Sequence, residues 1–292
     1  MAKKYLKMGV ESTFGTAAAT TPVRATDFKL TGDNNVIFLE TIDSHAPYDA
    51  VMGTYIVRDS FTMLAVHGQI DMLLEAVFGN NDAGVFTLDV PKSLTVEVGD
   101  EHGDAYKLSG VLITRAEFTF DVRDVVKVSG DYIARTMQAV THSYEEATAT
   151  KPYICWNTTV SVGGSSLKAK EFTMSIERGI RDDSYVLGSR FLDAIEYGVA
   201  NISGRCTLIG SEVDEFRRAI FGSASATSPV NEPVAADLEI VAKTPDNAHT
   251  MTIDISNAAV YTRGSKTISG SDPVSKTFEW RAVGDNIQIV LS

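Results

Sequence analysis

The chain has 292 residues, of which 44% are hydrophobic and 22% charged, as in an ordinary globular protein and unlike a disordered one. This length suits two domains of typical size, each large enough to bury its own core. The formal net charge of −12 argues against a protein that grips nucleic acid by its phosphates, because such binding requires clustered Lys and Arg.

No apolar run approaches the length that spans a bilayer, so we expect no membrane partner. A signal peptide has an apolar core after its basic start, but here polar residues 11–13 follow the basic start. We therefore expect no signal peptide. Cys155 and Cys206 give neither a disulfide framework nor metal-ligand spacing. These features fit synthesis in a reducing cytoplasm.

The first 25 residues show no helical period and are interpreted as an arm, since the stretch 9–22 is small, polar and punctuated by Gly and Pro. Strand patterns follow at 28–31, 35–40 and 55–66. Between the last two, Pro47 and neighbouring aspartates predict a long loop over 41–53.

Residues 69–79 predict a short helix. Apolar side chains recur at helical spacing and define its buried face, with Ile70, Leu73 and Phe78 as core residues. Gly79 stands where a left-handed C-terminal cap forms most easily. Short strands at 85–90 and 93–98 follow.

The clearest alternation in the chain begins at Leu112 and predicts a half-buried strand with one face in water. Its apolar face holds Leu112, Ala116, Phe118, Phe120 and Val122. Its polar face holds Arg115, Glu117, Thr119, Asp121 and Arg123. The pattern continues through 125–135 and ends at a polar joint over 141–151.

The second half opens with a hairpin turned by Gly163 and Gly164. An alternating strand at 172–176, a long loop at 180–193, a strand at 201–208 and a second helix at 212–222 follow. The helix is expected to be capped by Ser211, with Val213, Phe216 and Phe221 in the core. Five further strands extend from 238 to 291.

The second half repeats the first at nearly constant spacing. Phe28-Lys29-Leu30-Thr31 corresponds to Phe172-Thr173-Met174-Ser175, residues 57–64 correspond to 201–208, and both helices end in Phe-Gly. An internal duplication predicts two tandem domains, an N-terminal arm plus first domain over 1–143 and a second over 150–292. The alternative is two unrelated strand-to-helix units. We expect a mainly β fold, all-β or α+β, with one short helix in each half.

We find no pattern that predicts catalysis, a metal site or a cofactor. The five histidines are scattered, and no phosphate-binding Gly loop or nucleophile elbow is present. Asp71 and Asp214 recur in both halves, but their place in the first helical turn explains them as helix-capping residues. We therefore expect a protein that is not an enzyme.

The stretch Gly9-Val10-Glu11-Ser12-Thr13-Phe14-Gly15-Thr16-Ala17-Ala18 resembles the opening of tail tube proteins of tailed phages. The order of strands, long loop, strand and short helix ending in Phe-Gly is also similar to that family. The resemblance implies β-sandwich or barrel domains and a structural virion protein of the tail, synthesised in the host cytoplasm. It implies no functional residue, since the function of the family lies in a surface.

The resemblance further implies a major tail tube subunit that forms stacked rings around a channel. Two domains in one chain suggest homotrimeric rings with pseudo-sixfold symmetry. The expected partners are other copies of the chain, the tape measure protein and the tail terminator or adaptor proteins, with double-stranded DNA only in transit for genome ejection. Lumen-lining candidates on the polar strand faces are Glu117, Asp121, Asp131, Glu177 and Glu279. Ring-to-ring candidates in the arm and long loops are Phe14, Pro47, Tyr48, Tyr185 and Phe191.

Two other functions stay open. The chain could be another assembly protein, such as a tail adaptor or a fibre- or pilus-like subunit; an adaptor would form one ring and stop. It could also be an enzyme with an unrecognised site, which a pocket of buried carboxylates with strongly shifted pKa values would indicate.

Overall fold

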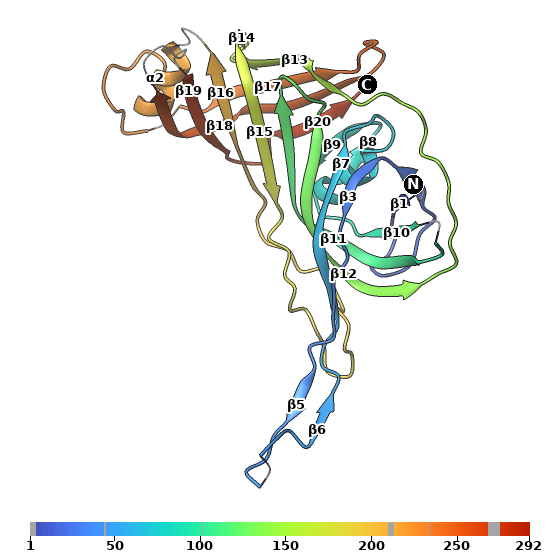
Figure 1. The fold of residues 1–292 in the computed structure, drawn as a ribbon. Coiled ribbons are helices and arrows are strands. Elements are labelled where there is room, and N and C mark those ends of the chain that lie inside the picture. The colour runs from blue at the N-terminus through green and yellow to red at the C-terminus, as the bar shows by residue number, and fades with distance from the viewer. Residues whose placement is uncertain (1–3, 44, 101, 210–212, 233, 268–274) are drawn as a thin grey trace.

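The computed structural model describes residues 4–43, 45–100, 102–209, 213–232, 234–267 and 275–292. The first half contains β1 (Lys4–Val10), β2 (Thr21–Val23), β3 (Ala25–Phe28), β4 (Gly32–Asp33), β5 (Ile37–Leu39), β6 (Asp49–Val51), β7 (Ile56–Leu64), α1 (Asp71–Phe78), β8 (Gly79–Asp82), β9 (Val85–Leu88), β10 (Leu94–Asp100), β11 (Ala105–Asp121) and β12 (Lys127–Ala139). The second contains β13 (Ile154–Val162), β14 (Ser165–Leu167), β15 (Ala169–Glu177), β16 (Asn201–Ile209), α2 (Val213–Phe221), β17 (Ala236–Lys243), β18 (Thr250–Thr267), β19 (Ser275–Ala282) and β20 (Ile287–Leu291). The expected mainly β fold with one short helix in each half is confirmed (Figure 1).

The beginning of the chain is not an arm. β1 pairs antiparallel with β10 and with β2, and Leu6 and Met8 are buried in the core. The interpretation as an arm failed because β1 is buried on both faces, Lys7 included, so the run from Tyr5 to Val10 has no alternating pattern, and its partner β10 lies far along the chain. Within residues 4–25, residues 11–20 and Arg24 lie outside strands.

The two halves follow the same order of strand pairing. In the first half β1 pairs with β10, β10 with β11, β11 with β12, β12 with β7 and β7 with β3. In the second half the corresponding pairs are β13 with β17, β17 with β18, β18 with β19, β19 with β16 and β16 with β15. The helix lies between corresponding strands in both halves. Each half is thus built on one plan.

The irregularities of the sheets also correspond. β3 and β15 each shift register before their third residue, at Thr26 and Lys170. β11 and β18 each shift register at a threonine, Thr114 and Thr262. A β-bulge bends its strand at a fixed place, so matched bulges give the two halves the same curvature.

The strand pairing corrects one detail of the sequence comparison. Ile56 lies opposite Asp33, and Asn201 lies opposite Glu177, so β7 and β16 correspond with a shift of one residue from the sequence alignment. Only this shift places the buried side chains of both strands on the same face, because side chains alternate along a strand.

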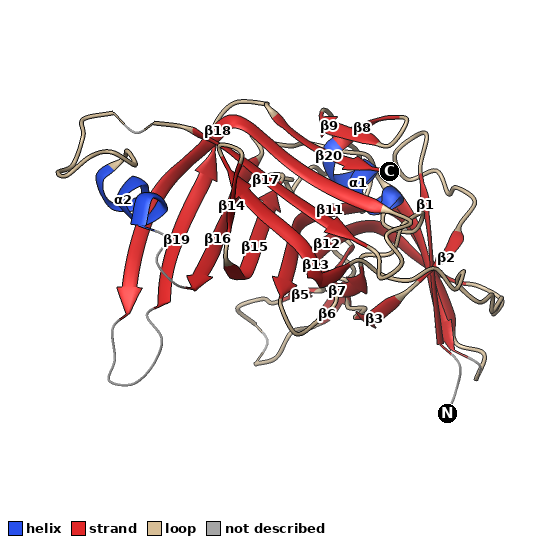
Figure 2. Cartoon of the chain, turned by 90° about the horizontal axis from the view of Figure 1, so that it is seen from above, coloured by secondary structure: helices blue, strands red, loops and turns tan. Residues whose placement is uncertain are grey.

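One sheet runs through both halves. β11 pairs antiparallel with β15 from Arg115 opposite Glu177 to Asp121 opposite Glu171, which gives the order β3-β7-β12-β11-β15-β16-β19-β18 (Figure 2). We call this pairing the β11–β15 seam. A second connection joins β20 of the second half to β9 of the first. The described strands do not close into a barrel within one chain.

The two helices differ in burial. At α1, the expected core residues Ile70, Leu73 and Phe78 are fully buried. Gly79 ends the helix with a positive φ of 94° and donates its N–H to Glu75 O, but its ψ of −38° lies outside the left-handed helical region that the C-cap expectation named. In α2, Phe216 and Phe221 are only half-buried. The Ser211 cap and the side chain of Val213 lie outside the described residues.

The Gly163-Gly164 turn is confirmed. Both glycines have positive φ values, 56° and 77°, and join β13 to β14 with Val162 opposite Ser165. A two-residue turn of this kind suits the twist of a hairpin.

The long loops of both halves extend to the same end of the molecule (Figure 1). Residues 29–55 form the longer projection, with the hairpin of β5 and β6 at its tip. Residues 178–200 run beside its base, where Arg190 accepts a hydrogen bond from Tyr55 N–H at 2.7 Å and donates one to Asn34 at 3.0 Å.

Candidate assembly surfaces

The shared sheet has one face on the core and one face in water. Cross-strand neighbours such as Phe118 and Met174 lie on the core side, whereas Glu117, Ser175 and Ser203 share a row on the other side. We call this second side the wet face. All five lumen-lining candidates lie on it, in the rows of Glu117, Asp121, Asp131, Glu177 and Glu279.

The wet face also carries basic side chains, which the choice of acidic candidates overlooked. They include Arg58, Arg115, Lys127, Arg205, Arg263 and Arg281. Arg115 pairs with Glu117, lies 3.9 Å from Glu177 across the seam and donates to Ser175 at 3.0 Å. Arg263 lies 3.9 Å from Glu279. The wet face is therefore a mixed surface of Ser, Thr and both charges. Alternation in the sequence would have found these basic residues, since Arg115 and Lys127 fall on the same polar stripes.

The ring-to-ring candidates separate into two groups. Pro47 and Tyr48 lie on the projecting hairpin, where Tyr48 is exposed. Phe14, Tyr185 and Phe191 instead make contacts within the chain. Phe14 lies under the guanidinium of Arg135, Tyr185 donates its hydroxyl to Tyr55 O, and Phe191 packs edge-on against the Tyr55 ring.

Phe14 and Tyr185 belong to a small hydrophobic cluster that the sequence did not predict. Leu192 of the second long loop covers Ile56, Leu112 and Ile133 of the first half. The second long loop, residues 178–200, thus covers the part of the wet face of the first half that holds Ile56, Leu112 and Ile133.

The projecting hairpin exposes an unusual number of large apolar side chains. They are Val36, Ile37, Phe38, Ile42, Tyr48, Val51 and Met52. Single exposed apolar residues are normal, but a gathered set on one projection is typical of an interaction surface.

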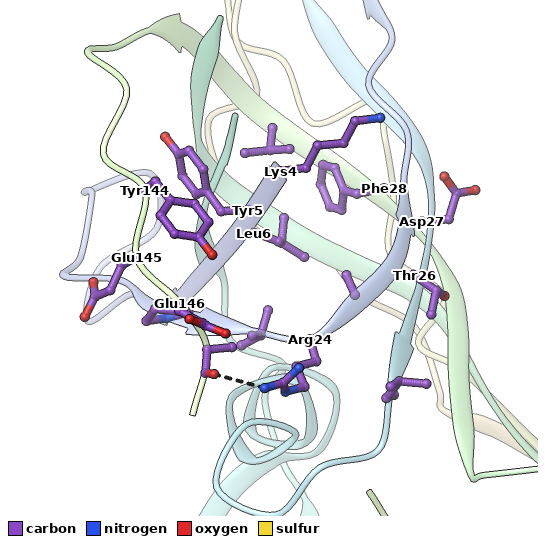
Figure 3. Close-up of a pocket in the computed structure, with 16 residues that line it drawn as sticks. Lys4, Tyr5, Leu6, Arg24, Thr26, Asp27, Phe28, Tyr144, Glu145 and Glu146 are labelled. Atoms are coloured by element: carbon purple, nitrogen blue, oxygen red, sulfur yellow. Dashed lines mark hydrogen bonds between the residues drawn. The ribbon is translucent and has the colours of Figure 1, made fainter. Parts of the chain in front are cut away.

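A groove of about 450 Å³ lies between β1, β3 and the segment that joins the halves (Figure 3). Lys4, Tyr5 and Tyr144 line it, and Arg24 donates a hydrogen bond to Ala147 O at 3.2 Å. Of its charged residues, Lys4, Asp27, Glu145 and Glu146 are exposed and Arg24 is half-buried.

Within the described ranges, no three His, Cys, Asp or Glu side chains gather as a metal site would require. Likewise, no helix in the part of the chain that the structure describes is long and apolar enough to cross a membrane. Burial raises the pKa of the Cys155 thiol to about 11 and that of Cys206 to about 12, so both stay protonated at neutral pH.

A family model described as phage tail tube protein matches residues 1–282. The chain belongs to the phage tail tube protein family. It is therefore a structural tail tube protein and a component of the virion tail. No curated protein matches the chain. The match covers both halves, including the Glu11 stretch that carried the resemblance in the sequence.

Proposed function

We propose that this protein is the major tail tube subunit and that three copies close a ring of six similar units around a channel for the genome. The observation that supports this most strongly is the β11–β15 seam, which joins two halves of the same plan edge to edge. The shared plan and the matched bulges also support a tandem duplication of one tail tube domain over 1–143 and 150–292.

The direction of the long loops supports a ring. Two units related by a twofold axis across the sheet would point their loops to opposite ends, whereas units related by rotation about a channel axis point them to the same end. Both loops of this chain point to the same end (Figure 1). Six such units, the number implied by the family resemblance, require three chains.

The wet face then lines the channel. Its Arg and acidic residues neutralise one another in pairs such as Arg115 with Glu177 and Arg263 with Glu279. A wall of paired charges and hydroxyls has no continuous basic track for phosphates, so DNA passes without being held. The projecting hairpin carries the ring-to-ring contact, and the tape measure and terminator or adaptor proteins are the expected partners in the tail.

Electron microscopy of the concentrated protein tests this function. We expect hollow tubes of uniform bore, with rings of threefold or pseudo-sixfold appearance in end views. Single rings that never stack would favour a tail adaptor, and solid fibres without a channel would favour a fibre- or pilus-like subunit.

A further inference from the structure

The shared sheet ends in two exposed strand edges. At one end the outer edge of β18 from Arg263 to Thr267 pairs with no described strand, since its other edge is taken by β19. At the other end the outer edge of the segment 29–33, which runs into β4, pairs with no described strand, since its inner edge is taken by β7. Figure 2 shows β18 and β3 at opposite ends of the sheet.

Long unpaired edges are a liability that proteins usually block with bulges, prolines or a covering element. Neither edge carries a proline. Four of the five residues from 263 to 267 and four of the five from 29 to 33 are exposed. These edges are therefore open to another strand.

The chain contains its own example of how such edges join. Residues 263–267 correspond to 115–119 of β11, because the bulges at Thr114 and Thr262 align the two strands. Residues 29–33 correspond to 173–177 of β15, because Thr26 and Lys170 align those strands. In the β11–β15 seam these equivalents pair antiparallel.

We propose that β18 of one copy pairs antiparallel with the 29–33 segment of a second copy, in the register that the β11–β15 seam dictates. Arg263 then lies opposite Asp33, Ser265 opposite Thr31 and Thr267 opposite Lys29. The inference rests on the proposed ring and adds its residue-level contact.

Charge complementarity supports this register. In the β11–β15 seam Arg115 has an acidic neighbour on its own half, Asp131, and another across the seam, Glu177. Arg263 already has an acidic neighbour on its own half, Glu279. The proposed register supplies the acidic neighbour across the contact, Asp33. A slip by one residue would place Arg263 opposite an uncharged neighbour and turn the paired side chains to opposite faces.

The backbone ladder carries the affinity, and the ion pair selects the register. Exposed ion pairs contribute little net binding energy, so Arg263 and Asp33 serve specificity. The same seam repeated three times joins both exposed edges of the shared sheet to a partner.

Disulfide trapping in the full chain tests the register. Directly opposed residues in an antiparallel pair have Cβ atoms about 5 Å apart, within reach of a disulfide after small adjustment. We expect the Ser265→Cys, Thr31→Cys double variant, after mild oxidation, to give bands of two and three linked chains and none larger. The native Cys155 and Cys206 are buried and give no background.

The matched control pairs Ser265→Cys with Leu30→Cys, one residue out of register and facing the core side. It should give no linked bands, as should either single variant. Equal linking in the control pair would overturn the proposed register. Rings in the microscope without linked bands in the test pair would overturn the proposed contact between copies and leave the tube function standing. The absence of both rings and linked bands would overturn the contact and the tube function together.

Charge reversal gives a second readout. Arg263→Asp should weaken linking and ring formation, because it places two acidic side chains opposite each other, and Asp33→Arg in the same chain should restore both. Arg281→Asp changes an exposed wet-face arginine away from the edge and should leave both unchanged. Unimpaired assembly of Arg263→Asp, or failure of the second change to restore it, would contradict the assigned pair.

Discussion

Glu11 organises the beginning of the chain. Its buried carboxylate accepts hydrogen bonds from the N–H groups of Gly15 and Gly110 and from the hydroxyls of Ser93 and Thr95, at 2.7–2.9 Å. These donors come from the loop after β1, from β10 and its approach, and from β11. One acidic residue thus fixes the loop that follows β1 against the sheet.

Replacement of Glu11 by alanine should therefore be strongly destabilising. Buried donors that lose their acceptor cost about 1–3 kcal/mol each, so we expect a loss of about 3 kcal/mol or more in the free energy of unfolding. Urea denaturation measures it. The exposed Glu40→Ala should change stability by less than about 0.5 kcal/mol, and a similarly small effect at Glu11 would show that the bonds do not hold the loop.

A histidine pair joins the two halves at another residue-level contact. The rings of His67 and His249 stack at 3.9 Å with an angle of 11°, and His67 Nδ1 lies 3.0 Å from the Tyr153 hydroxyl. Burial chiefly, and the charge of His249, lower the pKa of His67 below its usual 6.5, while Asp71 opposes them. The unfolded chain therefore binds a proton at His67 more readily than the folded chain does. The folded state keeps its full stability above about pH 6.5 and loses part of it as the pH falls below that value.

We accordingly expect the free energy of unfolding to fall between about pH 7.5 and about pH 5.5, above the range where carboxylates titrate. His67→Gln should flatten this slope, while His102→Gln in an exposed turn should not. Urea denaturation at several pH values gives the comparison. A slope that survives in His67→Gln would assign the pH dependence to other groups.

At the scale of elements, the two helices look alike in sequence and differ in packing. From helical spacing alone, both terminal phenylalanines are core residues, and truncation of either one would cost about 3 kcal/mol or more. Phe78 is fully buried, but Phe221 is half-buried and α2 turns Glu215 inward to accept the Tyr261 hydroxyl at 2.7 Å. An inward carboxylate means that α2 covers its sheet less completely than α1 does.

We therefore expect unequal effects. Phe78→Ala should cost about 3–5 kcal/mol, and Phe221→Ala about half of that or less, because the transfer and cavity contributions scale with the buried part of the ring. Thermal unfolding of the two variants measures the difference. Equal losses would mean that α2 is as closely packed as α1.

At the scale of the molecule, the exposed hairpin at the tip of the first long loop separates ring formation from ring stacking. Replacement of residues 37–51 by a short Gly-Ser link should leave rings intact and prevent tubes, because β5 pairs with β6 and the described residues of the hairpin are not part of the core cluster. Electron microscopy distinguishes the two products. Tubes formed by the shortened chain would locate the stacking contact elsewhere, and loss of rings would show that the hairpin also acts within the ring.

The sequence by itself determined the local structure of this protein. Period-two alternation located β11 and β12, helical spacing located α1, and the Gly pair fixed the β13–β14 turn, since each depends on residues close together in the chain. The repeat and the Gly9–Ala18 stretch were enough to indicate the family.

Only the tertiary structure decided which strands meet. Alternation assigns side chains to a face but does not specify the neighbouring strand or its register, which depend on contacts between distant residues. For that reason the β11–β15 seam, the burial of β1, the Arg residues opposite the acidic candidates and the in-chain role of Tyr185 became visible only when both halves were placed together.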